Sequence, residues 1–384
     1  MLKALNSNGQ EILAYNKSKQ ELNVIRQHPH YCPECQQKVV LKAGQVVIPH
    51  FAHIKRVQCS HQGESQTHLE GKIKLYNWCI KQGLYAKLEH IIPSIDQRVD
   101  VLVKLGGKWA AIEFQCSPIS TTDLLDRTLG LASRNVYPFW IFGPKYLGDH
   151  KYDLYWNTTL RSAVMYHQNT NQHQLFFFDP KTNRMTVATH LFNAKGKAVS
   201  SLKHLPLNSL TWHMLFEPVQ IQKSYYLQKW IKEKRNFRIG PTRYLSKYDE
   251  PFMKQLYLLG LHPQNLPSCV YLPVQNSYRL LLPDYVWQSQ IILYLNQIKV
   301  TQTVLIDHLL RLVKPYFGNT VTSIYPGRSM HPLIEYLSLL CQLGYLKKHS
   351  ASKYEKIRGF TFYQSLDRAL EGDKELLHKL FKFL

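Results

Sequence analysis

The sequence has few acidic residues, no long apolar runs and few cysteines. Its 384 residues include 26 Asp and Glu against 48 Lys and Arg, which gives a net charge of +22. This excess is typical of proteins that bind nucleic acid or another polyanion, although a basic surface can also serve solubility alone. Residues 224–384 hold 22 Lys and Arg and 11 Asp and Glu, so about half of the excess lies there. We therefore expect a polyanionic partner that touches more than one domain.

The sequence also lacks the features of membrane proteins, disulfide-rich proteins and several enzyme classes. No segment approaches the ~20 apolar residues that cross a bilayer, and the start of the chain lacks the hydrophobic core of a signal peptide. The seven cysteines are odd in number and unevenly spread, which fits a reducing compartment better than a set of disulfides. No phosphate-binding loop, dinucleotide fingerprint or nucleophile elbow is present. We expect a cytoplasmic protein of two or three domains, without membrane insertion.

A candidate metal site begins at Cys32 and Cys35. This Cys-x-x-Cys spacing presents two thiolates to one tetrahedral Zn²⁺, and His50, His53 and Cys59 follow within a short span. A redox pair would be expected within a βαβ pattern, which does not surround these cysteines. Free structural thiols are the remaining alternative to a closed zinc site that stabilises a small module.

Two carboxylates stand in a pair of predicted apolar strands joined by a tight Gly106-Gly107 turn. Asp100 lies among valines in the first strand, and Glu113 and Gln115 leave one face of the second. A buried carboxylate is strongly unfavourable unless it is paired or binds a metal. Two acids on adjacent strands can share one divalent cation, and oxygen ligands favour Mg²⁺ or Mn²⁺. The pattern predicts metal-dependent phosphodiester chemistry.

The order of short sequence words around these strands resembles a known family. Asp, a spacer and then Glu-x-Gln is similar to the PD-(D/E)xK nuclease superfamily, with Gln115 where most members have Lys. The wider set of words resembles the competence protein CoiA family, closely over residues 20–150 and poorly beyond. The words are Glu64-Ser65-x-x-His68-Leu69-x-x-Lys72, Asp100-Val101, Glu113-Phe114-Gln115-Cys116-Ser117-Pro118-Ile119-Ser120, the run from Arg127 to Trp140-Ile141-Phe142-Gly143, and the upstream Cys-Pro-x-Cys and His-Phe-Ala-His.

The resemblance implies a nuclease site on the two strands. Its catalytic residues would be Glu64, Asp100, Glu113 and Gln115, with Mg²⁺ or Mn²⁺ held by Asp100 and Glu113. Glu64 is the helix acid that belongs to the matching words, and Glu70 is the alternative. Because Gln is uncharged, Gln115 can orient a water but cannot supply the electrostatic stabilisation of Lys.

Three further residues of the matching words would support this site or contact DNA: His68, Lys72 and Arg127. From the sequence alone, Arg127 could equally be a solvated charge in the middle of a helix.

The resemblance to the CoiA family also carries five ligand-type residues for the four positions of a zinc site. We favour Cys32, Cys35, His53 and Cys59 as zinc ligands, with His50 as the substitute. The histidines expected at the surface are His28, His30 and His61.

The predicted fold is α/β (α+β) with three parts. Residues 1–62 would form a zinc-finger-like module with hairpins at 2–15 and 39–48, and residues 221–384 a basic, mainly helical domain. Residues 63–150, with an extension to 220, would form a PD-(D/E)xK restriction-endonuclease-like core. Its elements are a helix at 62–83, strands at 87–92, 97–105 and 108–116, a helix at 121–135 and a strand at 138–142.

The end of the chain predicts several helices and a basic ribbon. Helices are expected at 250–259, 284–295, 301–313 and 332–343, and a basic stretch at 223–238 reads as a helical linker. A ribbon formed by residues 344–348 and 360–363 would follow, and this order resembles a winged-helix DNA-binding unit. A generic helical domain is the alternative.

Two functions fit these features. The first is a Mg²⁺- or Mn²⁺-dependent nuclease that acts on incoming DNA during natural transformation, which the CoiA resemblance implies. The second is a nuclease fold with weak or no activity that binds DNA and recruits recombination or competence proteins. Two acids in an apolar strand pair favour the enzyme, because a scaffold does not need them. The sequence does not distinguish single-stranded from double-stranded DNA.

Overall fold

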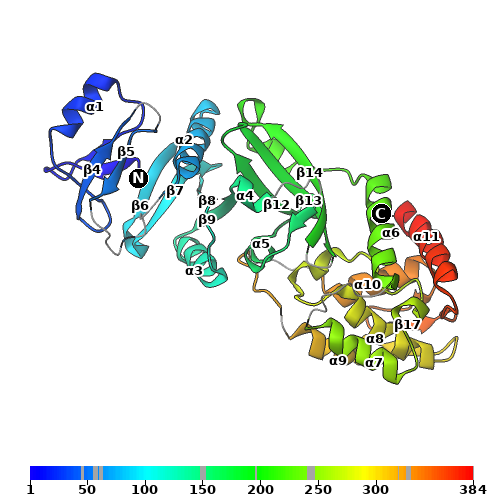
Figure 1. Cartoon of the computed structure of the whole chain (residues 1–384). Helices are drawn as coiled ribbons and strands as arrows, with labels where there is room; N and C mark the ends of the chain where they lie inside the picture. The colour runs from blue at the N-terminus through cyan, green and yellow to red at the C-terminus, as the bar shows by residue number, and fades with distance from the viewer. Residues whose placement is uncertain are drawn as a thin grey trace. The chain divides into compact units, whose positions relative to one another are not determined.

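The computed structural model describes residues 1–44, 47–54, 59, 64–147, 153–194, 197–239, 247–318, 320–325 and 330–383. The chain divides into two compact units (Figure 1). The first unit comprises residues 1–149, 175–187 and 203–216, and the second comprises residues 150–174, 188–202 and 217–384. Each unit is therefore built from separate stretches of the chain.

The first unit opens with a small antiparallel sheet in the order β2-β1-β3-β4-β5. Helix α1 (Lys19–Arg26) begins at Ser18, whose hydroxyl accepts the Glu21 amide while the Glu21 carboxylate accepts the Ser18 amide. The strands are β1 (Lys3–Leu5), β2 (Glu11–Leu13), β3 (His30–Tyr31), β4 (Lys38–Lys42) and β5 (His50–His53).

The first predicted hairpin is confirmed as β1–β2, but the second is wrong in its partner. Strand β4 pairs with β5, not with the apolar run before residue 49. Phe51 of β5 is buried among the core residues of this sheet. Burying this side chain fixes the register in which β5 pairs with β4. Residues 45 and 46 lie outside the described part of the chain.

A second, larger sheet has the order β10-β14-β13-β12-β9-β8-β7-β6, with β11 paired to β12. Its predicted core, a helix, three strands, a helix and a strand, is confirmed. Its helices are α2 (Gln66–Lys81), α3 (Thr121–Ala132), α4 (Pro144–Leu147) and α5 (Thr158–Ser162). The strands are β6 (Ala86–Ile92), β7 (Gln97–Leu105), β8 (Lys108–Gln115), β9 (Val136–Phe142), β10 (Asp153–Tyr155), β11 (Met165–His167), β12 (Gln172–Asp179), β13 (Arg184–Ala194) and β14 (Lys197–Pro206).

The turn between β7 and β8 is the tight glycine turn that the sequence predicts. Gly106 and Gly107 have φ of 51° and 83°, a conformation that residues with a Cβ rarely adopt. Strands β6, β7 and β8 are antiparallel neighbours, whereas β8 and β9 run parallel and are connected through α3. The sheet is therefore mixed, as expected.

Helix α2 packs against β6, β7 and β8 because Gly71 leaves room for an aromatic ring. A Cβ built on Gly71 would lie 1.9 Å from Phe114 Cε1, so the ring occupies the space that a side chain would need. Phe114 belongs to β8 and is buried. This contact fixes the distance between the helix and the two acid-bearing strands.

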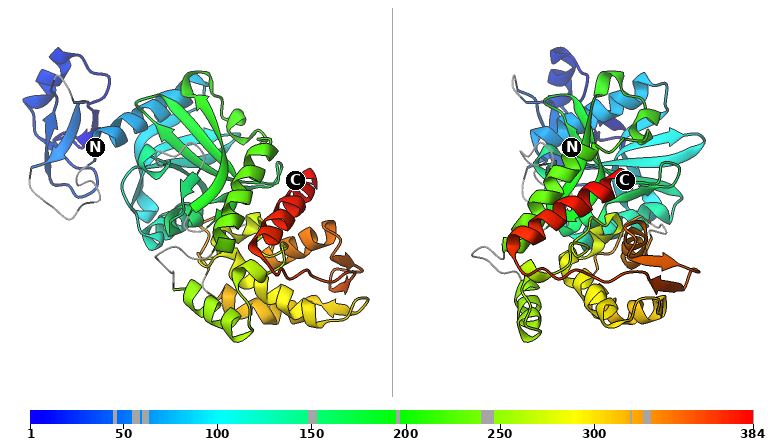
Figure 2. Two further views of the ribbon diagram at one scale, coloured as in Figure 1. Left: turned by 45° about the vertical axis from the view of Figure 1, so that its right-hand side comes forward. Right: turned by 90° about the vertical axis from the view of Figure 1, so that its right-hand side faces the viewer.

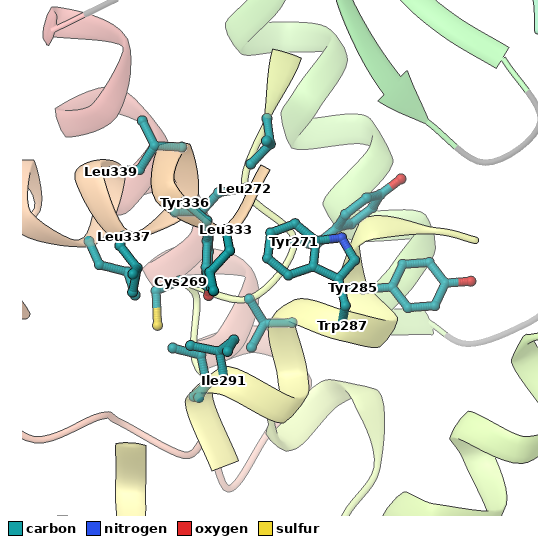
Figure 3. Packing of buried hydrophobic residues seen from close by; sticks show 14 of the residues in the cluster. Cys269, Tyr271, Leu272, Tyr285, Trp287, Ile291, Leu333, Tyr336, Leu337 and Leu339 are labelled. Atoms are coloured by element: carbon teal, nitrogen blue, oxygen red, sulfur yellow. The ribbon is translucent and has the colours of Figure 1, made fainter. Parts of the chain in front are cut away.

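The second unit is mainly helical and holds a large core (Figures 2 and 3). Its helices are α6 (Lys223–Ile239), α7 (Asp249–Leu258), α8 (Asp284–Gln297), α9 (Ile306–Phe317), α10 (Pro332–Gln342) and α11 (Leu366–Phe383). Three short strands form a sheet in the order β15-β17-β16. They are β15 (Thr303–Leu305), β16 (Leu346–Lys348) and β17 (Lys353–Lys356). The mixed α/β class with a helical C-terminal region is confirmed.

The core of this unit is rich in large aromatic rings. Trp287 and Tyr336 lie edge to face with their ring centroids 5.2 Å apart (Figure 3). Tyr336 also donates its hydroxyl to the Cys269 carbonyl at 2.8 Å, so its one polar group is satisfied.

Two expectations for this region are wrong. Helix α6 is not a linker, because Tyr226 and Trp230 are fully buried in the core. The second strand of the ribbon is Lys353–Lys356, not residues 360–363. Phe360 instead stacks on Tyr345, which explains why its apolar segment imitates a strand in the sequence.

A buried ion pair joins α6 to α11, which lie side by side (Figures 1 and 2). The Asp373 carboxylate accepts two hydrogen bonds from the Arg238 guanidinium, at 2.8 and 3.0 Å, and lies 3.2 Å from Lys234 Nζ. Burial alone would raise the pKa of Asp373, but Lys234 and Arg238 hold it below its usual value. Among the described residues, Asp373 is the carboxylate that pairs with both buried cations.

Replacing Gly71 by alanine should lower stability by about 1–3 kcal/mol through overpacking against Phe114, more than the gain in helix propensity restores. Thermal or urea unfolding would measure the change. Gly83→Ala is not a suitable control because its φ is positive, so Lys81→Ala at the exposed end of α2 is preferable. An unchanged melting temperature for Gly71→Ala would contradict this packing.

Replacing Asp373 by asparagine should cost about 3–5 kcal/mol, because it leaves two buried cations without a counter-charge. Asp367→Asn, at an exposed position of the same helix, should have little effect. Since the pKa of Asp373 is depressed in the folded state, its contribution is complete above about pH 3.9 and is lost as the pH falls through the folded pKa. Unfolding curves at neutral and acid pH would test both points.

Candidate active site and metal centre

Three acids from adjacent strands lie in one row of the large sheet. Leu88 and Val101 are paired between β6 and β7, and Val101 and Ile112 between β7 and β8. The same register therefore sets Glu89, Asp100 and Glu113 opposite one another across the three strands. Since all three side chains are buried, their charges need compensation within the protein.

The Asp100 carboxylate is held by groups from α2 and β8. Its Oδ2 accepts the Phe114 amide at 2.9 Å and lies 3.3 Å from His68 Nε2, while its Oδ1 lies 3.8 Å from Lys72 Nζ. Burial favours the protonated form, but His68, Lys72 and the Phe114 amide outweigh it and hold the pKa of Asp100 well below its usual range. Asp100 is therefore a carboxylate at neutral pH.

The Glu113 carboxylate is less well compensated. One oxygen, Oε2, pairs with Arg127 of α3, and the other, Oε1, is buried without a hydrogen-bond partner among the described residues. Burial raises the pKa of Glu113 to about 7; the Asp100 charge adds to this rise and Arg127 opposes it. Among the described residues, Glu113 is the acid of the row with a fully buried oxygen that accepts no hydrogen bond.

Glu64 and Lys72 belong to a buried ion network beside the row. Lys72 Nζ is fully buried, contacts the Glu89 carboxylate and lies 2.8 Å from Glu64 Oε1. Arg98 places its guanidinium 2.9 Å from Glu64 and 3.3 Å from Glu89. Although burial opposes charge on both partners, the pKa of Glu64 is lowered and that of Lys72 raised, so the network stays ionised.

Sequence reasoning missed Glu89. Its Oε2 accepts the backbone amides of Leu2 and Lys3 at 2.8 and 3.1 Å, which ties the small N-terminal sheet to β6. The signal was present, because Glu89 is an acid within an apolar strand, the same feature that singles out Asp100 and Glu113. The family words do not contain it.

The other predicted site residues have different surroundings. Gln115 donates its amide to the Ser117 carbonyl at 2.6 Å. His68 stacks on Phe114 and keeps part of its surface exposed, whereas Lys72 is too deeply buried to contact DNA and can only support the site. Glu70 pairs with Lys74 at 2.7 Å and does not join the acids.

The candidate zinc site lies in the small N-terminal sheet. Cys32, Cys35, His53 and Cys59 each place one ligand atom so that all lie within 4.8 Å of one another. The Cys35 sulfur is 3.2 Å from His53 Nε2, and the Cys32 and Cys59 sulfurs are 3.8 Å apart. Three thiols and one imidazole are the donor set of a structural zinc site, so this cluster could bind a metal such as zinc.

The contacts of the other nearby histidines show which of them could be metal ligands, which are buried and which are exposed. His50 lies next to the cluster in sequence, but its Nδ1 is 2.8 Å from the Ile48 carbonyl, which favours the four-ligand set without it. His28 is exposed, as expected. The surface assignment of His30 is wrong: it is buried against the Phe51 ring in the core of the sheet. His61 lies outside the described residues.

Protein purified without chelators should contain about one Zn²⁺ per chain. Cys32→Ser should lose most of this zinc and unfold the N-terminal sheet at a lower temperature, because a structural metal contributes folding free energy. His50→Ala should keep the zinc. Elemental analysis and thermal melting would measure both, and loss of zinc in His50→Ala would contradict the ligand set.

Three family models describe nearly the whole chain. The nuclease-like domain of competence protein CoiA matches residues 64–220, its C-terminal domain matches residues 226–370, and its N-terminal domain matches residues 14–62. The likeness therefore extends well beyond the stretch that carries the sequence words.

Competence protein CoiA of Bacillus subtilis (strain 168) is 26% identical over 366 residues, which cover 92% of this chain and 97% of that protein. No solved structure matches the chain. Among the described residues, no helix has both the length and the apolar character needed to cross a membrane. With its N-terminal, nuclease-like and C-terminal regions all matched, the chain belongs to the competence protein CoiA family.

Proposed function

We propose that the protein is a Mg²⁺- or Mn²⁺-dependent deoxyribonuclease of the PD-(D/E)xK type that processes incoming DNA in the cytoplasm during natural transformation. The observation that carries the proposal is the buried Glu113 carboxylate beside Asp100, with one oxygen that no described residue satisfies. A buried anion left in this state suits a divalent cation with oxygen ligands. The family match to a nuclease-like domain supports the same reading.

Asp100 and Glu113 would hold the metal. When bound, a divalent cation polarises the scissile phosphate and lowers the pKa of a water ligand. The Phe114 amide, which donates to Asp100 Oδ2, orients that carboxylate. The Lys72–Glu64–Arg98 network fixes α2 beside β7 without exposing a charge to solvent. The Glu64 charge is already balanced by Lys72, Arg98 and the Met1 amino group, although its Oε2 accepts no hydrogen bond among the described residues. Glu64 would therefore support the site rather than complete the metal shell.

Two partly exposed side chains, Arg127 and His68, define the side from which a phosphate could approach. Arg127 is about one third exposed, and His68 about one fifth. Both could meet a phosphate oxygen, since each already faces an acid of the site. Gln115 has no charge to offer and would orient a water or the backbone only.

A second candidate function is a protein with the nuclease fold that does not cleave DNA. In that case the protein would bind DNA and recruit recombination or competence proteins. Two contacts favour it: Arg127 already occupies one oxygen of Glu113, and the Gln115 amide is engaged with Ser117. Both would have to rearrange for catalysis.

Glu113→Gln should abolish metal-dependent cleavage and remove any rise in melting temperature caused by Mn²⁺, because the variant loses a ligand charge. The melting temperature without metal should stay near wild type or rise, since a poorly compensated buried charge disappears and Arg127, about one third exposed, can be hydrated. The assay would use single- and double-stranded DNA with Mg²⁺, Mn²⁺ or EDTA. Glu70→Gln, which changes a surface acid of α2, is the matched control and should cut as wild type.

Two outcomes would redirect the interpretation. If wild type and Glu113→Gln cut DNA equally well, the active site lies elsewhere. If neither cuts and the variant still abolishes transformation, the acids serve binding or assembly, as the second function requires. Gln115→Lys, which restores the commoner superfamily residue, should retain or raise the activity if the first function holds.

A further inference from the structure

The second unit contains an element order that resembles a winged helix. Helix α8, strand β15 and helices α9 and α10 are followed by the β16–β17 hairpin, and the three strands form one sheet. In DNA-binding proteins of the helix-turn-helix type, a recognition helix enters the major groove and contacts base edges. By its place in the order, α10 would be that helix.

Helix α10 cannot serve as a recognition helix. It contains no Lys or Arg, and its exposed side chains are Ser338 and Gln342. Its acid, Glu335, accepts the backbone amides of Gln275 and Asn276 at 2.8 and 2.9 Å. The other face is packed into the core through Leu333, Tyr336, Leu337, Leu339 and Leu340. Helix α10 therefore supports the fold and does not present side chains that could contact base edges.

The β16–β17 hairpin has the opposite character. Every residue from 347 to 353 is exposed, and Lys347, Lys348 and Lys353 form no ion pair with any described residue. The one acid of the hairpin, Glu355, contacts His349 and forms no ion pair with the three lysines, which outnumber it. The hairpin therefore presents an uncompensated positive charge.

The basic residues nearer the base of the hairpin have structural roles instead. Lys356 Nζ donates to the Ile298 carbonyl at 2.7 Å, and the Arg358 guanidinium stacks on Tyr345 with 3.9 Å to the ring centroid. These contacts anchor the ribbon to the unit. The charge available to a partner is thus concentrated at the tip.

The arrangement of the tip lysines favours DNA over an acidic protein surface. Adjacent residues of a strand point to opposite faces, so Lys347 and Lys348 put a charge on each face of the ribbon. A groove of duplex DNA has a phosphate strand on either side, whereas a protein surface would meet one face only. We propose that the β16–β17 hairpin binds the phosphate backbone of duplex DNA through Lys347, Lys348 and Lys353, with α10 as its buried support.

This interaction goes beyond the proposed cleavage and does not depend on it, because it uses none of the acids of the nuclease-like domain. It can be measured in EDTA by fluorescence anisotropy with a short labelled duplex. In Lys347→Gln/Lys348→Gln/Lys353→Gln, the affinity should fall severalfold. The slope of log affinity against log salt should shrink by about 3, because each lysine–phosphate contact releases about one counterion.

Two matched variants separate the hairpin from net charge and from α10. Lys374→Gln/Lys379→Gln/Lys382→Gln removes the same charge from exposed positions of α11 and should change the slope little. Ser338→Glu/Gln342→Glu puts negative charge on the exposed side of α10 and should leave the affinity near wild type. Melting temperatures of all three variants should match wild type, since every changed side chain is exposed. If the hairpin variant unfolds early, single Lys347→Gln should still lower the slope by about 1.

The proposal fails if wild type does not bind duplex DNA at low salt, or if the hairpin variant keeps the wild-type slope. It also fails if the α11 variant loses as much affinity as the hairpin variant, which would mean that only net charge matters. An equal loss in the α10 variant would place that helix at the DNA. Because the measurement is made in EDTA and scores binding alone, a failure of the cleavage proposal would leave this result unaffected.

Discussion

The ion pairs of the fully buried Lys72 ammonium are the interactions on which the acid-bearing sheet of the nuclease-like domain depends. The ammonium faces Glu64, Glu89 and Asp100, and Arg98 completes the compensation of the first two. Without these cations the sheet would hold several anions in an apolar setting, which is strongly unfavourable. The compensation is uneven, because it leaves one acid of the row with an unsatisfied oxygen. The unsatisfied oxygen belongs to Glu113, and it is the reason that this charge network is a candidate metal site.

The same network connects the two sheets of the first unit. Glu89 receives amides from the start of the chain, and the small N-terminal sheet also holds the Cys32–Cys35–His53–Cys59 cluster. A structural metal there would help to keep those amides in place. The sheet that holds the zinc cluster is thus hydrogen-bonded to the acid row through Glu89, although the two sites differ in chemistry.

Sequence patterns predicted the parts of this fold that follow local rules. The Gly106-Gly107 turn and the acid-bearing strands were readable because each rests on short spacing. The family resemblance added five candidates for the metal cluster, and the structure brings four of them together. Glu89 was visible in the sequence as a strand acid, but its role appears only when the strand register sets it opposite Asp100. The burial of His30 and the pairing of β17 also depend on tertiary packing, which overrides apolar runs such as residues 360–363. The supporting role of Lys72 needed its depth in the structure, which spacing does not give.

The interleaving of the two units has a consequence for synthesis on the ribosome. The second unit begins at residue 150, yet the partner of its buried Arg238 arrives only with Asp373, near the end of the chain. Until then, α6 carries buried-type aromatic residues and two cations that have no counter-charge. Contacts so distant in sequence close slowly and leave apolar surface open in the meantime. The first unit is therefore complete once residue 216 has emerged, whereas the second depends on the last helix to be made.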